Sequence, residues 1–285
     1  MSILQKTIQN KVTGKGFEFD DSINPRTGKP KHDYYLNGKR MSGITTVLQT
    51  IAKPMLIPWA AKMAVEYIDK HIWDIIVDNP HGEEATKKIE KVLEEAKNAH
   101  RNTKEKAGEL GTDIHSIIEK IIKDAIEKHE GYLEGHFDIK TGKITNGIEP
   151  VKQINYFFEW AIKHKVKFLA TEKQIYSESL FCAGTCDFIC EIDGEKFVGD
   201  LKTSGAIYAE YLYQVGAYRM MLEEMGEKNF SGAIIVRLGK DGKFDEDKDV
   251  AISYHYEDEK KAFLSALNLY RIGNNFKKNK FNNSL

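Results

Sequence analysis

The clearest pattern of hydrophobic and polar positions lies in the second half of the chain. Two runs rich in β-branched and aromatic residues, 185–192 and 196–203, flank an Asp-Gly pair at 193–194. Asp-Gly between two such runs is the strongest short-range signal for a tight β-hairpin turn. A turn centred there places Glu191 opposite Lys196, and opposite charges across a ladder stabilise the pairing. The pattern therefore predicts an antiparallel hairpin with a defined register.

The same register separates the two faces of the hairpin, because side chains alternate along each strand. Asp187 and Asp200 fall directly opposite each other, and Lys202 lies on the same face. Directly opposed side chains have Cβ atoms about 4.5–5.5 Å apart, so two carboxylates in these positions repel. A sequence that served stability alone would avoid this arrangement. The other face is expected to be core and carries Cys186, Phe188, Cys190, Ile192, Phe197, Gly199 and Leu201.

A divalent cation would remove the conflict between the two carboxylates. Hard oxygen ligands on a rigid hairpin suit Mg²⁺ or Mn²⁺, which bind one or two carboxylates, keep several waters and accept substrate phosphate. Lys202 would then hold or polarise an attacking water beside the phosphate. The plainer interpretation is an exposed sheet face on which an Asp and a Lys form an ordinary ion pair, which is the usual meaning of a single Asp-x-Lys.

The rest of the chain predicts helices and strands around this hairpin. Gly108 and Gly111 are expected to break a long helical pattern, and Thr112 to cap the helix that follows. The spacing of apolar residues predicts short strands within 15–39, helices over 58–77, 83–107, 112–129, 151–164, 207–226 and 257–276, and strands over 167–176, 233–238 and 250–256. This order of elements indicates an α/β fold.

Composition limits the kind of nucleic-acid contact that the chain can make. At 285 residues with 41% hydrophobic content, it can bury a sizeable core as one domain or two. The formal net charge is −1, so affinity for DNA would come from local basic patches and from bound metal. The basic end of the 83–107 helix, with Lys97, Arg101, Lys104 and Lys106, either complements the helix dipole or forms a wall that faces phosphates.

The cysteines and the hydropathy of the chain bear on its cofactors and on where in the cell it acts. The cysteines at 182, 186 and 190 are expected to be packed thiols, because an iron–sulfur cluster normally needs four ligands and a disulfide framework needs more cysteines. No apolar run reaches the length of a membrane span, and residues 1–16 lack the apolar region of a signal peptide. We expect a protein without a membrane partner that acts in the cytoplasm of a bacterial or phage-infected cell.

Three local motifs occur in a fixed order in the second half of the chain. They are Gly-x-x-Asp at 184–187, Asp-Leu-Lys at 200–202, and Gln214-x-x-x-Tyr218 on a predicted helix. This constellation resembles the PD-(D/E)XK nuclease superfamily, in the branch of RecB-like and phage recombination exonucleases. The resemblance implies a restriction-endonuclease-like core, which is a central mixed sheet flanked by helices, with an N-terminal helical elaboration.

The resemblance also implies roles for individual residues. Asp187, Asp200 and Lys202 match the catalytic positions, and Asp rather than Glu before x-Lys is a permitted variant. The Leu201 carbonyl matches a position that commonly completes the metal shell in such enzymes. The glutamine and tyrosine of the helix motif match residues that line the DNA groove.

A second stretch resembles a metal-binding helix of the same nucleases. Residues 111–119 match Gly-Thr-x-x-His-x-x-x-Glu, in which the histidine reaches the metal, so the resemblance makes His115 a metal ligand and Glu119 a supporting residue. From its own residues alone, His115 is equally an ordinary solvated or hydrogen-bonded helix histidine. Glu172, on the predicted strand 167–176, matches a family position near the metal, although a glutamate facing solvent is as good an interpretation.

Together these features predict a Mg²⁺- or Mn²⁺-dependent deoxyribonuclease with one or two ions and no iron–sulfur cluster. Residues 1–108 would form N-terminal strands and helices packed on a nuclease core of residues 109–285. We expect an exonuclease that works from single-stranded or duplex DNA ends in recombination, repair or phage DNA metabolism, with a possible recombination partner protein. The alternatives are a catalytically silent nucleic-acid-binding or recombination accessory protein, and a structure-specific endonuclease of the same fold.

Overall fold

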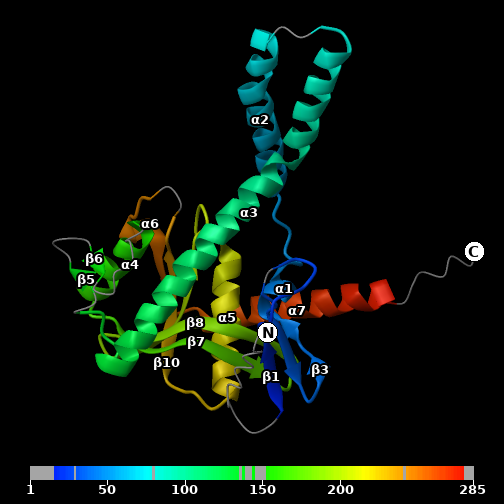
Figure 1. Cartoon of the computed structure of the whole chain (residues 1–285). Helices are drawn as coiled ribbons and strands as arrows, with labels where there is room; N and C mark the ends of the chain where they lie inside the picture. Colours follow the sequence, from blue (N-terminus) through cyan, green and yellow to red (C-terminus); the bar gives the residue numbers. More distant parts are fainter. Residues whose placement is uncertain are drawn as a thin grey trace, which may run out of the picture. The chain divides into compact units, whose positions relative to one another are not determined.

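A computed structural model of the chain describes residues 16–28, 30–78, 81–134, 137–138, 143–144, 152–239 and 242–278 (Figure 1). Its helices are α1 (Ile44–Leu48), α2 (Leu56–Asp78), α3 (Glu83–Lys128), α4 (Lys152–Lys163), α5 (Ala209–Glu224), α6 (Glu246–Asp249) and α7 (Tyr256–Lys278). Its strands are β1 (Phe17–Asp20), β2 (Asp33–Leu36), β3 (Lys39–Arg40), β4 (Ser42–Gly43), β5 (Phe137–Asp138), β6 (Lys143–Ile144), β7 (Lys167–Ser177), β8 (Cys182–Ile192), β9 (Glu195–Lys202), β10 (Phe230–Arg237) and β11 (Val250–Ser253).

The chain divides into two compact units. One contains residues 1–51 together with 115–285, and the other contains residues 52–114. The smaller unit consists of α2 and the first part of α3, and the larger unit contains every described strand. Among the described residues, no helix combines the length and the apolar character needed to cross a lipid bilayer.

A mixed sheet organises the larger unit. The order β11-β10-β9-β8 includes antiparallel β10/β11 and β8/β9 pairs and a parallel β9/β10 pair, while β7 pairs antiparallel along the other edge of β8. A parallel pair requires a crossover, and α5 supplies it between β9 and β10. The larger unit is therefore an α/β fold with a mixed central sheet flanked by helices, as the sequence predicts.

Helices cover both faces of this sheet. On one face α5 lies across β7 to β10 and packs in turn against α7, as Figure 1 shows. Ile189 and Val198 point into that layer. On the opposite face, Phe157 of α4 packs against Phe168 and Phe188, with ring centroids 5.7 Å and 6.3 Å away. Because both faces are buried, the polar groups on the α5 side need partners within the protein.

The hairpin between β8 and β9 has the predicted register near its turn, but the predicted direct pairing of Asp187 with Asp200 is wrong, because the two strands separate before reaching them. Glu191 lies opposite Lys196 and Ile189 opposite Val198, and the ladder ends with Phe188 opposite Gly199. Asp193 and Gly194 have φ of 51° and 81°, as a type I′ turn requires. The expectation of packed thiols is also confirmed, since the cysteines at 182, 186 and 190 are all free and buried.

The predicted break at Gly108 and Gly111 is wrong. A single helix, α3, runs through both glycines, and the boundary between the two units falls inside it, between Ile114 and His115. The Thr112 hydroxyl does not cap a new helix but donates to the Gly108 carbonyl one turn earlier, at 3.0 Å. A glycine within a helix costs only about 1 kcal/mol relative to alanine, which the helix on either side outweighs.

Candidate active site

The candidate site begins where β8 and β9 separate. β7 pairs along one edge of β8. The other edge is shared, since β9 pairs with residues 188–192 of β8 and β4 pairs with residues 182–183. Neither ladder includes Asp187. Its carboxylate Oδ2 instead accepts the backbone N–H of Leu201 at 2.7 Å, so a side chain replaces the missing ladder bond. This bond turns the Asp187 carboxylate toward β9.

Asp200 is the second carboxylate, on β9, and it is almost completely buried, with 1% of its surface exposed. Its Oδ2 contacts the Lys202 ammonium, while its Oδ1 accepts a hydrogen bond from Gln214 Nε2 at 3.2 Å. Gln214 Nε2 also donates to the hydroxyl of buried Tyr218, one turn further along α5. Both side chains are buried, so the motif supports the Asp200 carboxylate from within the protein, and the expectation that Gln214 and Tyr218 line a DNA groove is wrong.

The protonation of the two carboxylates reflects their surroundings. The pKa of Asp200 is raised to about 6, chiefly by burial and also by the neighbouring Asp187, while Lys202 opposes the rise. Burial also raises the pKa of Asp187 against the effects of Lys202 and the Leu201 N–H. Burial disfavours the charged form of Lys202, but Asp200 and Asp187 outweigh it and raise the pKa of the ammonium. The Lys202 ammonium therefore stays charged beside Asp200.

His115 reaches the same place from α3. Its Nδ1 lies 3.6 Å from Asp187 Oδ2, and 30% of its side chain is exposed. Burial lowers the pKa of His115 to about 4, with Asp200 opposing the shift and Lys202 adding to it. The ring is thus neutral near pH 7, which is the form of histidine that binds metals.

Glu172 and Glu119 form a further acidic pair next to Asp187. On β7 the ladder with β8 skips Glu172, which would lie opposite Asp187, and its φ of 47° is left-handed. Burial first, and then the negative charges of Asp187 and Glu119, raise the pKa of Glu172 to about 8. Glu119 itself forms an ion pair with Lys123. Glu172 is therefore partly buried and close enough to Asp187 and Glu119 to feel their charges.

A buried ion pair fixes the loop that follows Lys202. Arg237, at the end of β10, pairs with Asp249 and donates from Nη1 to the carbonyls of Ser204 and Gly205 at 3.2 Å and 3.4 Å. The Leu238 N–H donates to the Lys202 carbonyl at 2.6 Å. Hydrogen bonds from Leu238 and Arg237 thus hold the backbone at Lys202 and in the loop just after it.

The donor set fits a hard divalent cation in its chemistry. Asp187 and Asp200 supply carboxylate oxygens, Leu201 a backbone carbonyl, and His115 a neutral ring nitrogen. Within the described residues, buried Asp200 Oδ2 accepts no hydrogen bond of good geometry, although the Lys202 ammonium lies against it. As arranged, the described part of the chain contains no group of three or more His, Cys, Asp or Glu side chains that would hold a metal ion.

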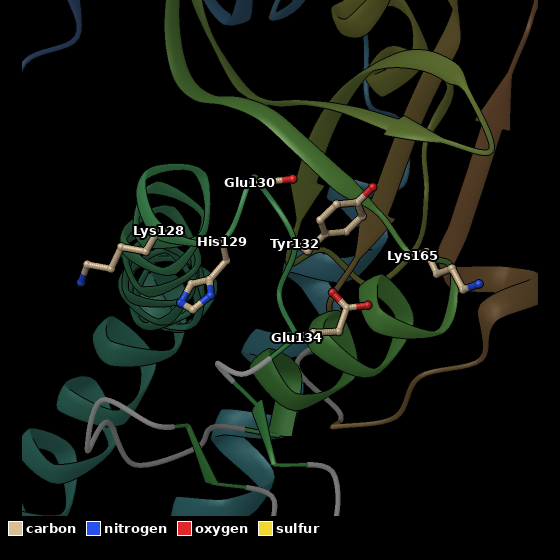
Figure 2. Close-up of a pocket in the computed structure, with 6 residues that line it drawn as sticks. All are labelled: Lys128, His129, Glu130, Tyr132, Glu134 and Lys165. Atoms are coloured by element: carbon tan, nitrogen blue, oxygen red, sulfur yellow. The ribbon is translucent and has the colours of Figure 1, made fainter.

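A surface cavity lies away from these residues. Figure 2 shows its lining at the end of α3, in the segment after that helix and in the turn after α4, and none of the predicted site residues contributes to it. Lys167 Nζ lies 5.9 Å from the ring centroid of Tyr132, one of the lining residues. The lining residues are Lys128, His129, Glu130, Tyr132, Glu134 and Lys165.

Sequence reasoning located the two aspartates, the lysine and the histidine, and the structure brings all four together. It missed Arg237 and Asp249, which lie far apart from the motifs in sequence and carry no local signal. It also gave no role to Tyr208, although Tyr208 and Tyr211 are one helical turn apart at the start of α5. The sequence matches no protein-family model, and comparison with curated proteins finds no match.

Proposed function

We propose that this chain is a Mg²⁺- or Mn²⁺-dependent deoxyribonuclease with a restriction-endonuclease-like core, of the RecB-like and phage-type branch of the PD-(D/E)XK nucleases. One observation carries the proposal: Asp187, Asp200 and Lys202 converge where β8 and β9 separate. Two buried carboxylates of raised pKa beside each other destabilise a fold, so their juxtaposition favours a functional role over a structural one. A module that only binds nucleic acid has no need of this arrangement.

The residues of the site have separable roles in phosphodiester hydrolysis. Asp187, Asp200, the Leu201 carbonyl and neutral His115 would hold the cation. When bound, a divalent metal polarises the scissile phosphate and lowers the pKa of bound water. Gln214 keeps the Asp200 carboxylate oriented through its 3.2 Å hydrogen bond, so that the other carboxylate oxygen is presented to the site. Glu119 adds negative charge on the side of Asp187, whereas Glu172, whose pKa is about 8, is mostly protonated at neutral pH without a cation and adds charge only when it ionises.

Lys202 acts on the nucleophile and the phosphate. Its ammonium is mostly enclosed, with 17% of the side chain exposed, and its raised pKa keeps it charged at neutral pH. A cation in this position orients an attacking water by hydrogen bonding and stabilises the negative charge that develops on the phosphate oxygens. Both contributions require the ammonium and are lost with an uncharged side chain of similar length.

We infer that the enzyme works from DNA ends. A site-specific endonuclease needs side chains that read base edges, most often Arg, Asn or Gln in a compact cluster. Lysine far outnumbers arginine in this chain, which favours sequence-independent contact with the phosphate backbone. End processing of this kind belongs to recombination, repair or phage DNA metabolism.

Cleavage of labelled DNA by the purified chain tests the proposal. We expect products with Mg²⁺ or Mn²⁺ and none with EDTA, and we expect Asp200→Asn and Lys202→Met each to lower the rate by about a hundredfold or more. The matched control is Asp193→Asn, which removes one carboxylate from the turn of the same hairpin, where asparagine tolerates the φ of 51°. DNA binding without cleavage by the native protein would instead support a silent binding protein.

A further inference from the structure

An exposed tyrosine pair stands at the start of α5. Tyr208 occupies the position that precedes the first turn of this helix, and 46% of its surface is exposed. Its ring meets that of Tyr211 edge to face, with centroids 5.5 Å apart and planes at 76°. An edge-to-face neighbour fixes the direction of the Tyr208 ring and leaves much of it accessible.

This pair is joined to the candidate active site through Lys202. The Lys202 ammonium lies over the ring of Tyr211, 4.9 Å from its centroid, and contacts Asp200. A chain of contacts therefore runs from the buried carboxylate to the exposed Tyr208 ring. Arg237 donates to the carbonyls of Ser204 and Gly205 in the loop between Lys202 and Tyr208, which restrains the backbone that joins them.

Helix stability gives no reason for a tyrosine here. Position 208 makes no side-chain capping hydrogen bond, although Ser, Thr, Asp or Asn there would stabilise the helix start. An exposed aromatic ring on an uncapped helix start adds apolar surface without burying it. Aromatic rings are, however, the side chains on which proteins stack unpaired nucleobases, because every base has a π face.

We propose that Tyr208 stacks on a nucleobase of single-stranded DNA and so positions the adjoining phosphate at Lys202 and Asp200. This inference rests on the proposed nuclease function and names its substrate class. A base inside a duplex has both faces covered by its neighbours, so a stacking residue next to the reacting phosphate selects unpaired or frayed ends. Tyr208 is a positioning residue, since it acts on the nucleotide and not on the reacting atoms.

Binding measured without metal tests stacking independently of cleavage. Short single-stranded oligonucleotides each carry one 2-aminopurine, placed at successive positions from either end, and its fluorescence falls when the base stacks. With the native protein we expect strong quenching at one position. Tyr208→Leu should abolish this quenching and weaken binding by roughly tenfold to a hundredfold, while Tyr208→Phe and Tyr208→Trp should retain both.

The matched control is Tyr254→Leu. Tyr254 is also exposed, at 57%, and also packs edge to face, against Phe197, but its hydroxyl donates to Glu195 at the hairpin end of β9. We expect this variant to bind and quench like the native protein. Equal quenching and affinity for Tyr208→Leu and native protein would overturn the inference.

A paired substitution in the DNA separates stacking from a structural effect. An abasic site at the quenched position should weaken native binding as much as Tyr208→Leu does, and the variant should lose nothing more on that DNA. Additive losses would show that the ring does not touch this base and would overturn the inference. Normal quenching without any metal-dependent cleavage would support base stacking while refuting the nuclease.

Discussion

Glu172→Gln should stabilise the metal-free protein increasingly as pH rises. Glu172 is a partly buried glutamate whose pKa is raised from 4.5 to about 8 by burial first, and then by Asp187 and Glu119. In the unfolded chain the carboxyl releases its proton near its ordinary pKa, whereas the folded protein keeps it to about pH 8. The folded state binds more protons in this window, so the free energy of unfolding falls as pH rises through it.

The magnitude follows from the size of the shift. Each pKa unit corresponds to about 1.4 kcal/mol, so the rise from 4.5 to about 8 has an upper bound of about 5 kcal/mol above pH 8. Part of the side chain reaches solvent, which screens the charge and reduces this figure. We expect the variant to gain about 2 kcal/mol over the native protein between pH 6 and pH 9, because glutamine cannot ionise.

Urea unfolding in EDTA at pH 6, 7, 8 and 9 measures this difference. The matched control is Glu18→Gln, which removes a carboxylate from an exposed position on β1. We expect its curve to stay parallel to that of the native protein. A constant difference between Glu172→Gln and the native protein across this pH range would refute the reasoning, since it would show that Glu172 titrates alike in both states.

Four further outcomes follow from the site and from the proposed preference for DNA ends. Without metal, Asp187→Asn should be as stable as the native protein or more stable by up to about 1 kcal/mol, because one like-charge contact is lost. Added Mg²⁺ should raise the melting temperature of the native protein more than that of the variant, and equal shifts would refute this. His115→Ala should raise the Mn²⁺ concentration that gives half-maximal cleavage, and an unchanged titration would leave His115 as an ordinary helix residue. Linear DNA should be degraded to short products while closed circles stay intact, and comparable cutting of both would indicate an endonuclease.

Local signals in the sequence were sufficient for the hairpin and its register. The Asp-Gly turn and the alternation on both sides act over a few residues, so no distant contact was needed to predict the pairs from the turn to Phe188 and Gly199, whereas the separation of the strands at Asp187 was not predicted. Helical spacing likewise placed Gln214 and Tyr218 on one side of α5. Helical spacing could not predict the hydrogen bond from Gln214 to Asp200, because that bond depends on how α5 crosses the sheet.

Other features depend on contacts that no local pattern encodes. The left-handed backbone at Glu172 arises in a ladder that skips one residue, and a glutamate in a strand carries no signal for this. The continuity of α3 through Gly108 and Gly111 was missed because a glycine within a helix and a glycine at its end look alike in sequence. In the structure, α3 continues through both positions, and the Thr112 hydroxyl bonds back to the Gly108 carbonyl instead of capping a new helix.

The separation of β8 from β9 explains why the site lies where it does. In a fully paired antiparallel ladder the Leu201 N–H would bond to a backbone carbonyl, and no carboxylate could approach it. Here Asp187 takes that N–H at 2.7 Å, while β10 stays paired with β9 as far as Lys202. The edge of β9 that faces β10 is therefore held by backbone pairing, whereas at Leu201 the edge that faces β8 is bonded by the Asp187 side chain. The open edge of β9 faces Asp187 of β8, so two carboxylates and an ammonium are held together despite the repulsion between the carboxylates and the cost of burying all three, which is the preorganisation that the proposed phosphodiester hydrolysis would need.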